Sequence, residues 1–372
     1  MLFFQGEVTC NFMEKVMRKF NQASFCLAMA VLLLSVTVAH ADVFNMGGTY
    51  NQTTGTWTGM ASLQFVTVGD PGNAANPSTG YGSVGYTYQM GKYDVTVGQY
   101  CQFLNAVAKT DTYGLYYSGM DSNYSTIGIT QSNSSGSYTY SVTGSYSQAA
   151  NCPMFYVSWA DAARFCNWLQ NGQPTGPEGT GTTETGAYTL DGTTSNSALM
   201  AITRNAGATY VIPSEDEWYK AAYYNPSNAT YWLYPTQNNT APSNVLSPTG
   251  TNNANFATGS YTDPTNKLTP VGAFADSPGP YGTYDQGGDI YQWNEAKFSG
   301  SYRGVSGGQW HDSSMFLESS VVGAFGNCYP TVEDSGYGFR VAEVPEPGSL
   351  AMLVAGALSL LAYTGRRRTR TT

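Results

Sequence analysis

Residues 303–340 read RGVSGGQWHDSSMFLESSVVGAFGNCYPTVEDSGYGFR, and this stretch carries the features that bear most on fold and chemistry. It contains the motif GGQW and ends in GFR. Between these motifs it holds one histidine, His311, and one cysteine, Cys328, which stands close to Pro330. The ten residues that follow GGQW, HDSSMFLESS, therefore offer no thiol to a reaction site.

The composition favours a turn-rich, aromatic-packed extracellular protein. The 372 residues include 42 Gly and 29 Tyr, and only 11% are charged, whereas the hydrophobic fraction of 41% is enough for a packed core. Between residues 42 and 343, nine Lys and Arg stand against 22 Asp and Glu, which gives a net charge of −13. Such a surface has little with which to neutralise phosphates. Nucleic acid is therefore disfavoured as a partner, and cations or neutral glycans are favoured.

The N-terminal residues 1–41 are typical of a signal peptide. Three basic residues precede the apolar run CLAMAVLLLSVTVA, and Ala-His-Ala places small residues where signal peptidase reads them. We expect cleavage after Ala41. The first dozen residues do not fit such a signal, so Met13 and Met17 are alternative translation starts. An uncleaved membrane anchor is the alternative interpretation.

The C-terminal residues 344–372 predict a short membrane span. VPEPGSL is followed by an apolar stretch, 348–364, and then by four arginines. This order resembles the PEP-CTERM sorting signal of bacteria that make exopolysaccharide. The resemblance implies transient anchoring in the inner membrane, processing by an exosortase-type enzyme, and delivery to the cell surface or extracellular matrix. A plain C-terminal anchor is the alternative.

Four cysteines lie between the terminal segments: Cys101, Cys152, Cys166 and Cys328. Their spacings match no zinc-site pattern and no dense disulfide framework. Cys101 and Cys166 stand beside apolar positions of amphipathic helix patterns, so we expect small buried core residues. Because an exported protein can form disulfides, one bridge among the four remains open.

A series of motifs follows in order along residues 62–342. They are YQMGKYDVTVGQYCQFLNAVA, CPMFYVSWADAARFCNWLQNG, YVIPSEDEWYKAAYY, YGTYDQGGDIYQWNEA and the segment from GGQW to GFR. The first three predict helices with Thr96, Ser158 and Ser214 as N-caps. Glu217 stands three residues after Ser214, which predicts a capping box.

In this order the motifs resemble the formylglycine-generating enzyme family, whose domain is the sulfatase-modifying-factor domain. The resemblance implies an α+β, irregular, loop-rich fold related to C-type lectins, here as a single domain over residues 42–343. The Gly-, Ser-, Thr- and Asn-rich stretches 110–150 and 171–205 suit long loops or insertions.

The resemblance also implies two structural Ca²⁺ sites made of oxygen ligands. The first would use the side chains of Asn255 and Asp263 and the carbonyls of Phe256 and Thr265. The second would use the side chains of Asp285 and Gln292 and the carbonyls of Gly288 and Ile290. The second set departs from the family pattern, which has Asn at the position of Asp285 and Glu at that of Gln292. Asx turns in Gly-rich loops are the alternative explanation of both sets.

The family's oxidases bind copper through two cysteine thiolates shortly after GGS and convert a sulfatase cysteine to formylglycine. Soft thiolates suit Cu(I), and HDSSMFLESS has none, so copper is not expected. His311, Asp312 and Glu318 are weak catalytic candidates. The three-histidine iron site of a related branch is excluded, because His311 is the only histidine outside the signal peptide.

Two function classes remain. The favoured one is an exported, non-catalytic binding or structural module whose Tyr- and Trp-rich surface stacks on sugar rings, with exopolysaccharide as the candidate ligand. The alternative is a sulfatase-modifying oxidoreductase with an atypical metal site. The sequence has no nucleophile elbow, P-loop or dinucleotide motif. Its acidic pairs, Glu215 with Glu217 and Glu333 with Asp334, fit a helix start and a turn.

Overall fold

The computed structural model describes residues 63–122, 124, 126–323 and 328–345, and the backbone of two strands at 49–51 and 56–58. The expected signal peptide and the apolar segment 348–364 lie outside these residues. Across the described ranges, no helix has the length and apolar character needed to cross a bilayer.

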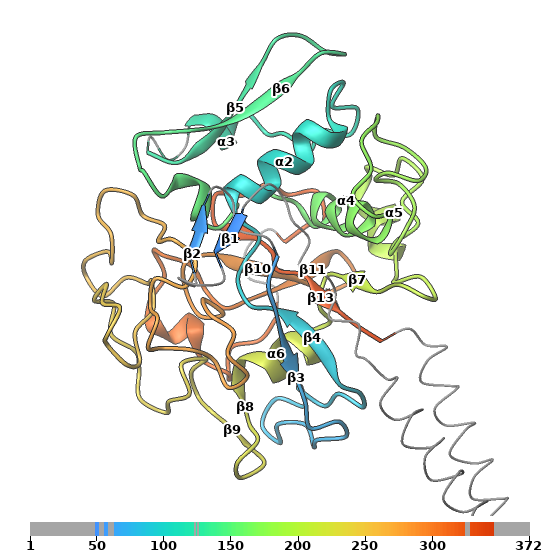
Figure 1. Cartoon of the computed structure of the whole chain (residues 1–372). Helices are drawn as coiled ribbons and strands as arrows, with labels where there is room; N and C mark the ends of the chain where they lie inside the picture. Colours follow the sequence, from blue (N-terminus) through green and yellow to red (C-terminus); the bar gives the residue numbers. More distant parts are fainter. Residues whose placement is uncertain are drawn as a thin grey trace, which may run out of the picture. The chain divides into compact units, whose positions relative to one another are not determined.

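Short elements joined by long loops build the domain (Figure 1). The described helices are α2 Val97–Val107, α3 Gly119–Ser122, α4 Trp159–Gln170, α5 Asn196–Ala201 and α6 Glu215–Tyr223, with 3-10 turns η1 Ala149–Asn151 and η2 Ser314–Leu317. The strands are β1 Thr49–Asn51, β2 Thr56–Thr58, β3 Phe65–Val68, β4 Tyr88–Gly91, β5 Gly128–Ser132, β6 Thr139–Thr143, β7 Tyr210–Val211, β8 Tyr224–Asn225, β9 Thr230–Tyr231, β10 Tyr291–Phe298, β11 Tyr302–Ser306, β12 Tyr337–Gly338 and β13 Ala342–Glu343. Few helices and several small sheets confirm the predicted irregular α+β fold.

The three longest helices begin where the sequence predicted. Thr96, Ser158 and Ser214 are the N-caps of α2, α4 and α6, and each hydroxyl accepts a hydrogen bond from the backbone N–H of the third helical residue. At α6, Glu217 closes the capping box by accepting from the N–H of Ser214 at 2.7 Å. Caps of this kind contribute about 1 kcal/mol each, so local sequence fixes these three helix starts.

Two sheets bring distant parts of the chain together. The larger has the strand order β3-β4-β13-β7, with antiparallel pairs throughout. In it, Ala342 of β13 lies opposite Met90 of β4 and Val211 of β7. The smaller has the order β11-β10-β12, in which β10 and β12 are parallel. The strand after GFR therefore lies between two strands, β4 and β7, that come much earlier in the chain.

Aromatic side chains fill the space between α2 and α4, which lie side by side (Figure 1). The ring of Phe165 on α4 is 5.2 Å from that of Phe103 on α2 and 5.2 Å from that of Phe339, both edge to face. Such pairs add about 0.5–1.5 kcal/mol beyond area burial. The phenylalanine of GFR thus anchors the end of the domain to its two main helices.

The cysteines are core residues, as predicted. Cys101 on α2, Cys166 on α4, Cys152 and Cys328 are all buried. Cys101, Cys152 and Cys166 form no disulfide. Burial raises the pKa of Cys101 to about 11, so this thiol stays protonated at neutral pH. Packing, rather than redox chemistry, explains these three residues.

Candidate functional site

The GGQW motif forms a sharp turn directly after β11. Gly307 and Gly308 have φ angles of 104° and 76°, in the left-handed region that glycine favours. A Cβ on Gly307 would lie 2.7 Å from the carbonyl oxygen of Gln286, which leaves no room for a side chain. After the turn, Trp310 donates its N–H to the carbonyl of Asp289 at 3.0 Å. The paired glycines therefore place Trp310 against the loop that precedes β10.

Six aromatic rings in mutual contact, here called the aromatic chain, pass through Trp310. In spatial order they are Tyr117, Tyr156, Phe155, Tyr124, Trp310 and Tyr261, with successive ring centroids 4.9, 5.9, 4.7, 6.1 and 5.0 Å apart. Tyr124 and Phe155 are buried, whereas the end residues Tyr117 and Tyr261 are 40% and 41% exposed. Trp310 Nε1 also donates to Tyr124 Oη at 2.9 Å. The middle of the aromatic chain is thus buried, and the ring at each end is partly exposed to solvent.

Two further groups flank the Trp310 end of the aromatic chain. Lys267 Nζ lies 4.5 Å from the ring centroid of Tyr261 and 5.8 Å from that of Trp310. The imidazole of His311 lies 4.9 Å from the Trp310 ring. Cation–π contacts at exposed positions contribute about 0.5–1 kcal/mol, so Lys267 helps to hold these rings in place.

The structure brings together two of the three weak catalytic candidates. His311 Nε2 lies 3.9 Å from Asp312 Oδ1, and the histidine is exposed. Glu318 is engaged elsewhere, because its carboxylate accepts from Tyr234 Oη at 2.8 Å and from Ser320 Oγ at 3.0 Å. Within the part of the chain that the structure describes, no three His, Cys, Asp or Glu side chains form a metal-binding group.

The single cysteine of the stretch lies away from the GGQW turn. The carbonyl of Cys328 accepts a hydrogen bond from the N–H of Arg303 at 2.9 Å, and its Sγ lies 3.4 Å from Tyr337 Oη. Arg303 belongs to the first half of β11, whereas the turn follows its last residue. Because a strand advances about 3.3 Å per residue, roughly 13 Å of strand separates Arg303 from Gly307. The main chain at Cys328 therefore pairs with the start of β11, before the GGQW turn.

The comparisons with known proteins agree with this geometry. A family model described as the sulfatase-modifying factor enzyme 1-like domain matches residues 42–344. The chain belongs to this family. Among curated proteins, none matches the chain significantly.

Several solved structures are similar to this sulfatase-modifying-factor domain. CarF is 18% identical, with 76% of this chain and 98% of that chain covered and a TM-score of 0.47. Treponema denticola variable protein 1 is 16% identical, with 80% and 99% covered and a TM-score of 0.47. PvdO from Pseudomonas aeruginosa is 16% identical, with 80% and 98% covered and a TM-score of 0.40.

The first predicted calcium set leaves one oxygen without a partner. Asn255 is buried, and its Nδ2 donates to the carbonyl of Lys267 and to Asp289 Oδ1, both at 2.9 Å. Asn255 Oδ1, the atom that would bind the ion, is buried and accepts no hydrogen bond. Asp263 caps its own loop by accepting from the N–H of Thr265 at 2.9 Å, and it is half-buried. An orphaned amide oxygen beside a carboxylate-bearing loop fits a cation.

The second predicted calcium set does not fit a cation in this arrangement. Gln292 Oε1 accepts from Trp218 Nε1 at 2.7 Å and from Arg340 Nε at 2.6 Å, which uses both of its lone pairs. The carboxylate of Asp285 accepts from the N–H of Gly272 at 2.6 Å. A buried guanidinium therefore supplies positive charge where the family pattern implies an ion. The sequence could not reveal this, because Arg340 is 48 residues from Gln292.

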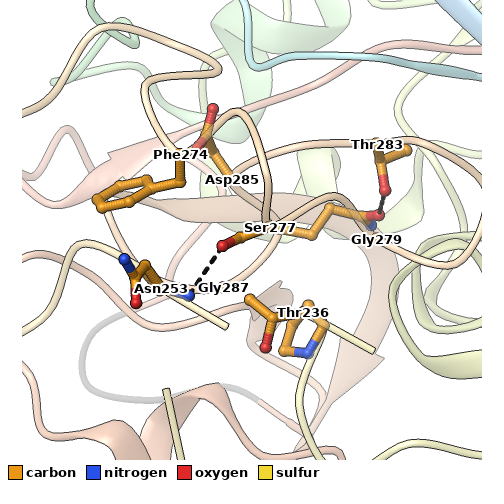
Figure 2. A pocket seen from close by; sticks show the side chains of 11 residues that line it. Thr236, Asn253, Phe274, Ser277, Gly279, Thr283, Asp285 and Gly287 are labelled. Atoms are coloured by element: carbon orange, nitrogen blue, oxygen red, sulfur yellow. Dashed lines mark hydrogen bonds between the residues drawn. The ribbon is translucent and has the colours of Figure 1, made fainter. Parts of the chain in front are cut away.

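A small cavity of about 10 Å³ lies beside Asp285 (Figure 2). Its wall includes Asn253 and Ser277, and Asn253 donates its N–H to Ser277 Oγ at 2.9 Å. Of the second calcium set, only Asp285 lines it. A cavity of this size holds about one water molecule, so it has no room for a substrate.

The acidic pairs have structural roles. Glu215 is buried and accepts from Asn294 Nδ2 at 2.6 Å and from Ser306 Oγ at 3.1 Å. Glu217 forms an ion pair with Arg204 at 2.9 Å. Because the two carboxylates have different partners, they do not form a general acid and base pair.

Sequence reasoning missed a larger cavity, of about 360 Å³. Trp159 and Tyr188 contribute to its wall, together with Arg204, Lys297 and Arg303. These residues are far apart in the chain except for the two cations of the β10–β11 hairpin. The domain has only nine Lys and Arg between residues 42 and 343. Two of them close together, Lys297 and Arg303, were the one sequence feature that could have pointed to this cavity.

Proposed function

We propose that this protein is an exported, non-catalytic member of its family that binds matrix polysaccharide through the exposed Trp310 end of the aromatic chain. The observation that carries the proposal is the contact of Trp310 with Tyr261, 41% of which is exposed, directly after the GGQW turn. The signal peptide and sorting signal expected from the sequence would deliver the protein to the cell surface or matrix.

The side chains beside Trp310 support a binding role over oxidation. The family's copper chemistry needs two thiolates in this segment, and the residues present there are His311, Asp312, serines, Met315 and Glu318. Burial raises the pKa of Asp312, and His311 is exposed next to it. These groups can form hydrogen bonds with hydroxyl groups, but they do not reproduce a soft-metal site.

The ring faces suit sugars. Tyr and Trp side chains combine a large apolar face with one polar atom, and a pyranose has apolar C–H faces and a rim of hydroxyl groups. Lys267 and His311 stand beside the rings as hydrogen-bonding groups. The buried contacts of Trp310 with Tyr124 would keep the surface rigid, which limits the entropy lost on binding.

Calcium at the first predicted set would act as a structural ion. Asn255 Oδ1 and the Asp263 carboxylate would hold it with the carbonyls of Phe256 and Thr265. Because this loop leads directly to Tyr261 and Lys267, the ion would stabilise the same surface. The second predicted set is not included in the proposal.

Binding to immobilised polysaccharides, with and without EGTA, tests the proposal. We expect the purified protein to bind at least one matrix polysaccharide, and Tyr261→Ala to weaken this binding roughly five- to tenfold, which corresponds to about 1–1.5 kcal/mol. Tyr302→Ala is the matched control, because the ring of Tyr302, on the β10–β11 hairpin, lies tilted against that of Tyr329 with centroids 4.8 Å apart. Equal binding by all three proteins would contradict a role for the aromatic chain.

A further inference from the structure

Lys297 and Arg303 lie directly opposite each other on β10 and β11. Residues paired in this way across antiparallel strands project from the same face of the sheet, and like charges there are destabilising. The pairing follows an irregularity of register between Trp293 and Lys297. Bulges of this kind are frequent next to functional sites, and a local arrangement that opposes stability is expected there too.

Glu295 acts electrostatically on both cations but forms an ion pair with neither. Neither Lys297 nor Arg303 takes part in an ion pair among the described residues. The Arg303 guanidinium donates to the neutral carbonyls of Glu295, Leu199 and Ile202 at 3.0, 2.7 and 2.8 Å. Its carbon lies 3.7 Å from the ring centroid of Trp159, and its Nε has no acceptor. A buried cation is thus held by dipoles and a ring, with one donor unused.

The two neighbouring carboxylates share one arginine, so one negative charge among these three groups remains unbalanced. Arg204 lies between Glu217 and Glu295, with ion-pair distances of 2.9 and 2.8 Å. Counting these three charges with Lys297 and Arg303 leaves a net charge of +1, in a domain whose net charge is −13. Burial lowers the pKa of Arg303 to about 10, which is consistent with a missing counter-ion. A concave site of this kind attracts anions.

The cavity next to this pair has the volume of a small-ligand site. Its volume of about 360 Å³ lies in the range of 300–1,000 Å³ that is common for such pockets. Lys297 is exposed, and Arg303 is buried deeper in the wall. Tyr86 and Tyr188 add aromatic surface, and Glu295 adds a hydrogen-bond acceptor. The cavity therefore combines positive charge, ring faces and a group that can bind hydroxyls.

We propose that this cavity binds a carboxylated pyranose, a hexuronate unit, with its carboxylate at Lys297, where the charge of the buried Arg303 adds to that of the lysine. A bare inorganic anion would leave the aromatic wall and most of the volume unused. Glu295 would accept hydrogen bonds from ring hydroxyls, while its ion pair with Arg204 offsets part of its charge. This inference is independent of sugar binding at Trp310, because it concerns a separate cavity.

Isothermal titration calorimetry of the purified full-length protein tests the proposal. Sodium glucuronate is compared with glucose, which lacks the carboxylate, and with sodium acetate, which lacks the ring. We expect glucuronate to bind at least tenfold more tightly than either, and less tightly as salt is raised. Alginate, a polymer of hexuronates, and dextran, a neutral polymer, extend the comparison. Binding of alginate but not dextran would show that the ligand is a hexuronate within a polymer. Binding of glucuronate alone would show that it is a free sugar. Equal affinity for glucuronate and glucose would overturn the proposal.

Lys297→Glu separates ligand binding from folding. It replaces a like-charged cross-strand pair by an oppositely charged one, so Tm should stay the same or rise while glucuronate binding falls at least tenfold. Lys109→Glu makes the same charge change at an exposed lysine of another loop and should leave binding unchanged. Undiminished binding by Lys297→Glu, or an equal loss in both variants, would rule out a site at this pair.

Discussion

Arg340 Nε donates a hydrogen bond of 2.6 Å to Gln292 Oε1, and this bond ties the closing GFR motif to β10. The same guanidinium donates to the carbonyls of Gly91 and Tyr284 at 2.7 and 2.8 Å and to Asp94 Oδ1 at 3.2 Å. Arg340 and Asp94 are both buried. One side chain thus links the end of β4, the loop before β10, and β10 itself.

Replacing this arginine should destabilise the domain severely. Arg340→Met leaves Asp94 without its partner and removes one donor from each of three further acceptors, and breaking a buried pair in this way costs about 3–5 kcal/mol. Urea unfolding measures the loss. Lys109→Met, at an exposed lysine, should change the free energy of unfolding by less than about 0.5 kcal/mol. A loss below about 1 kcal/mol for Arg340→Met would show that the network is not required.

Calcium should act through the first predicted set alone. Asp263→Asn retains the oxygen that accepts from the N–H of Thr265 but removes the charge and the acceptor of Asn266 Nδ2, so it should lower calcium affinity at least tenfold and lower Tm in EGTA only slightly. Asp285→Asn is the matched control at the second set, where Gln292 Oε1 is already occupied. Thermal unfolding with and without calcium distinguishes them. Equal losses of calcium affinity in the two variants would show that the second set also binds the ion. A Tm of the unmodified protein that does not change with calcium would exclude the first set.

Stability should fall with rising pH because of Glu215. Burial raises the pKa of this carboxyl from 4.5 to about 7, so the folded state binds the proton more tightly than the unfolded state. The contribution of Glu215 to stability is therefore largest below pH 4.5 and declines up to pH 7, by an amount on the order of 3 kcal/mol. Glu215→Gln removes this decline, whereas Glu318→Gln, at a half-buried carboxylate, should keep it. Parallel stability profiles for Glu215→Gln and the unmodified protein would contradict the assignment.

Two glycine positions test the geometry of the GGQW turn. Gly307→Ala places a Cβ 2.7 Å from a backbone oxygen at positive φ, so it should cost about 3 kcal/mol or more. Gly300→Ala shares the positive φ of 73° but meets no atom within 4 Å, so only the backbone strain of about 1 kcal/mol remains. Similar losses in the two variants, measured by urea unfolding, would show that the close approach at Gly307 is relieved.

Local signals were sufficient for part of the fold. The N-caps Thr96, Ser158 and Ser214 act within one turn of helix, so sequence spacing alone located them. The stretch 110–150, for which long loops or insertions were expected, contains the hairpin of β5 and β6. That hairpin packs on α2, where Asn105 Nδ2 donates to the carbonyl of Tyr140 at 2.8 Å. A tertiary contact of this kind overrides a loop-like composition.

Features of the site that depend on distant residues were not predictable. The side-chain oxygen of Gln292 accepts hydrogen bonds from Trp218 and Arg340, and these two residues approach it only in the folded chain. The cationic cavity requires the register of β10 and β11, because a slip of one residue would move Lys297 to the other face. The sequence indicated the family and the absence of thiols, whereas the folded arrangement was needed to find the cavity.

The most direct test of the central claim is incubation of the purified protein with copper, oxygen and a peptide containing CxPxR, followed by mass spectrometry of the peptide. Because the ten residues that follow GGQW include no cysteine, the account predicts that the peptide cysteine remains unchanged. Conversion of that cysteine to formylglycine would contradict a non-catalytic role.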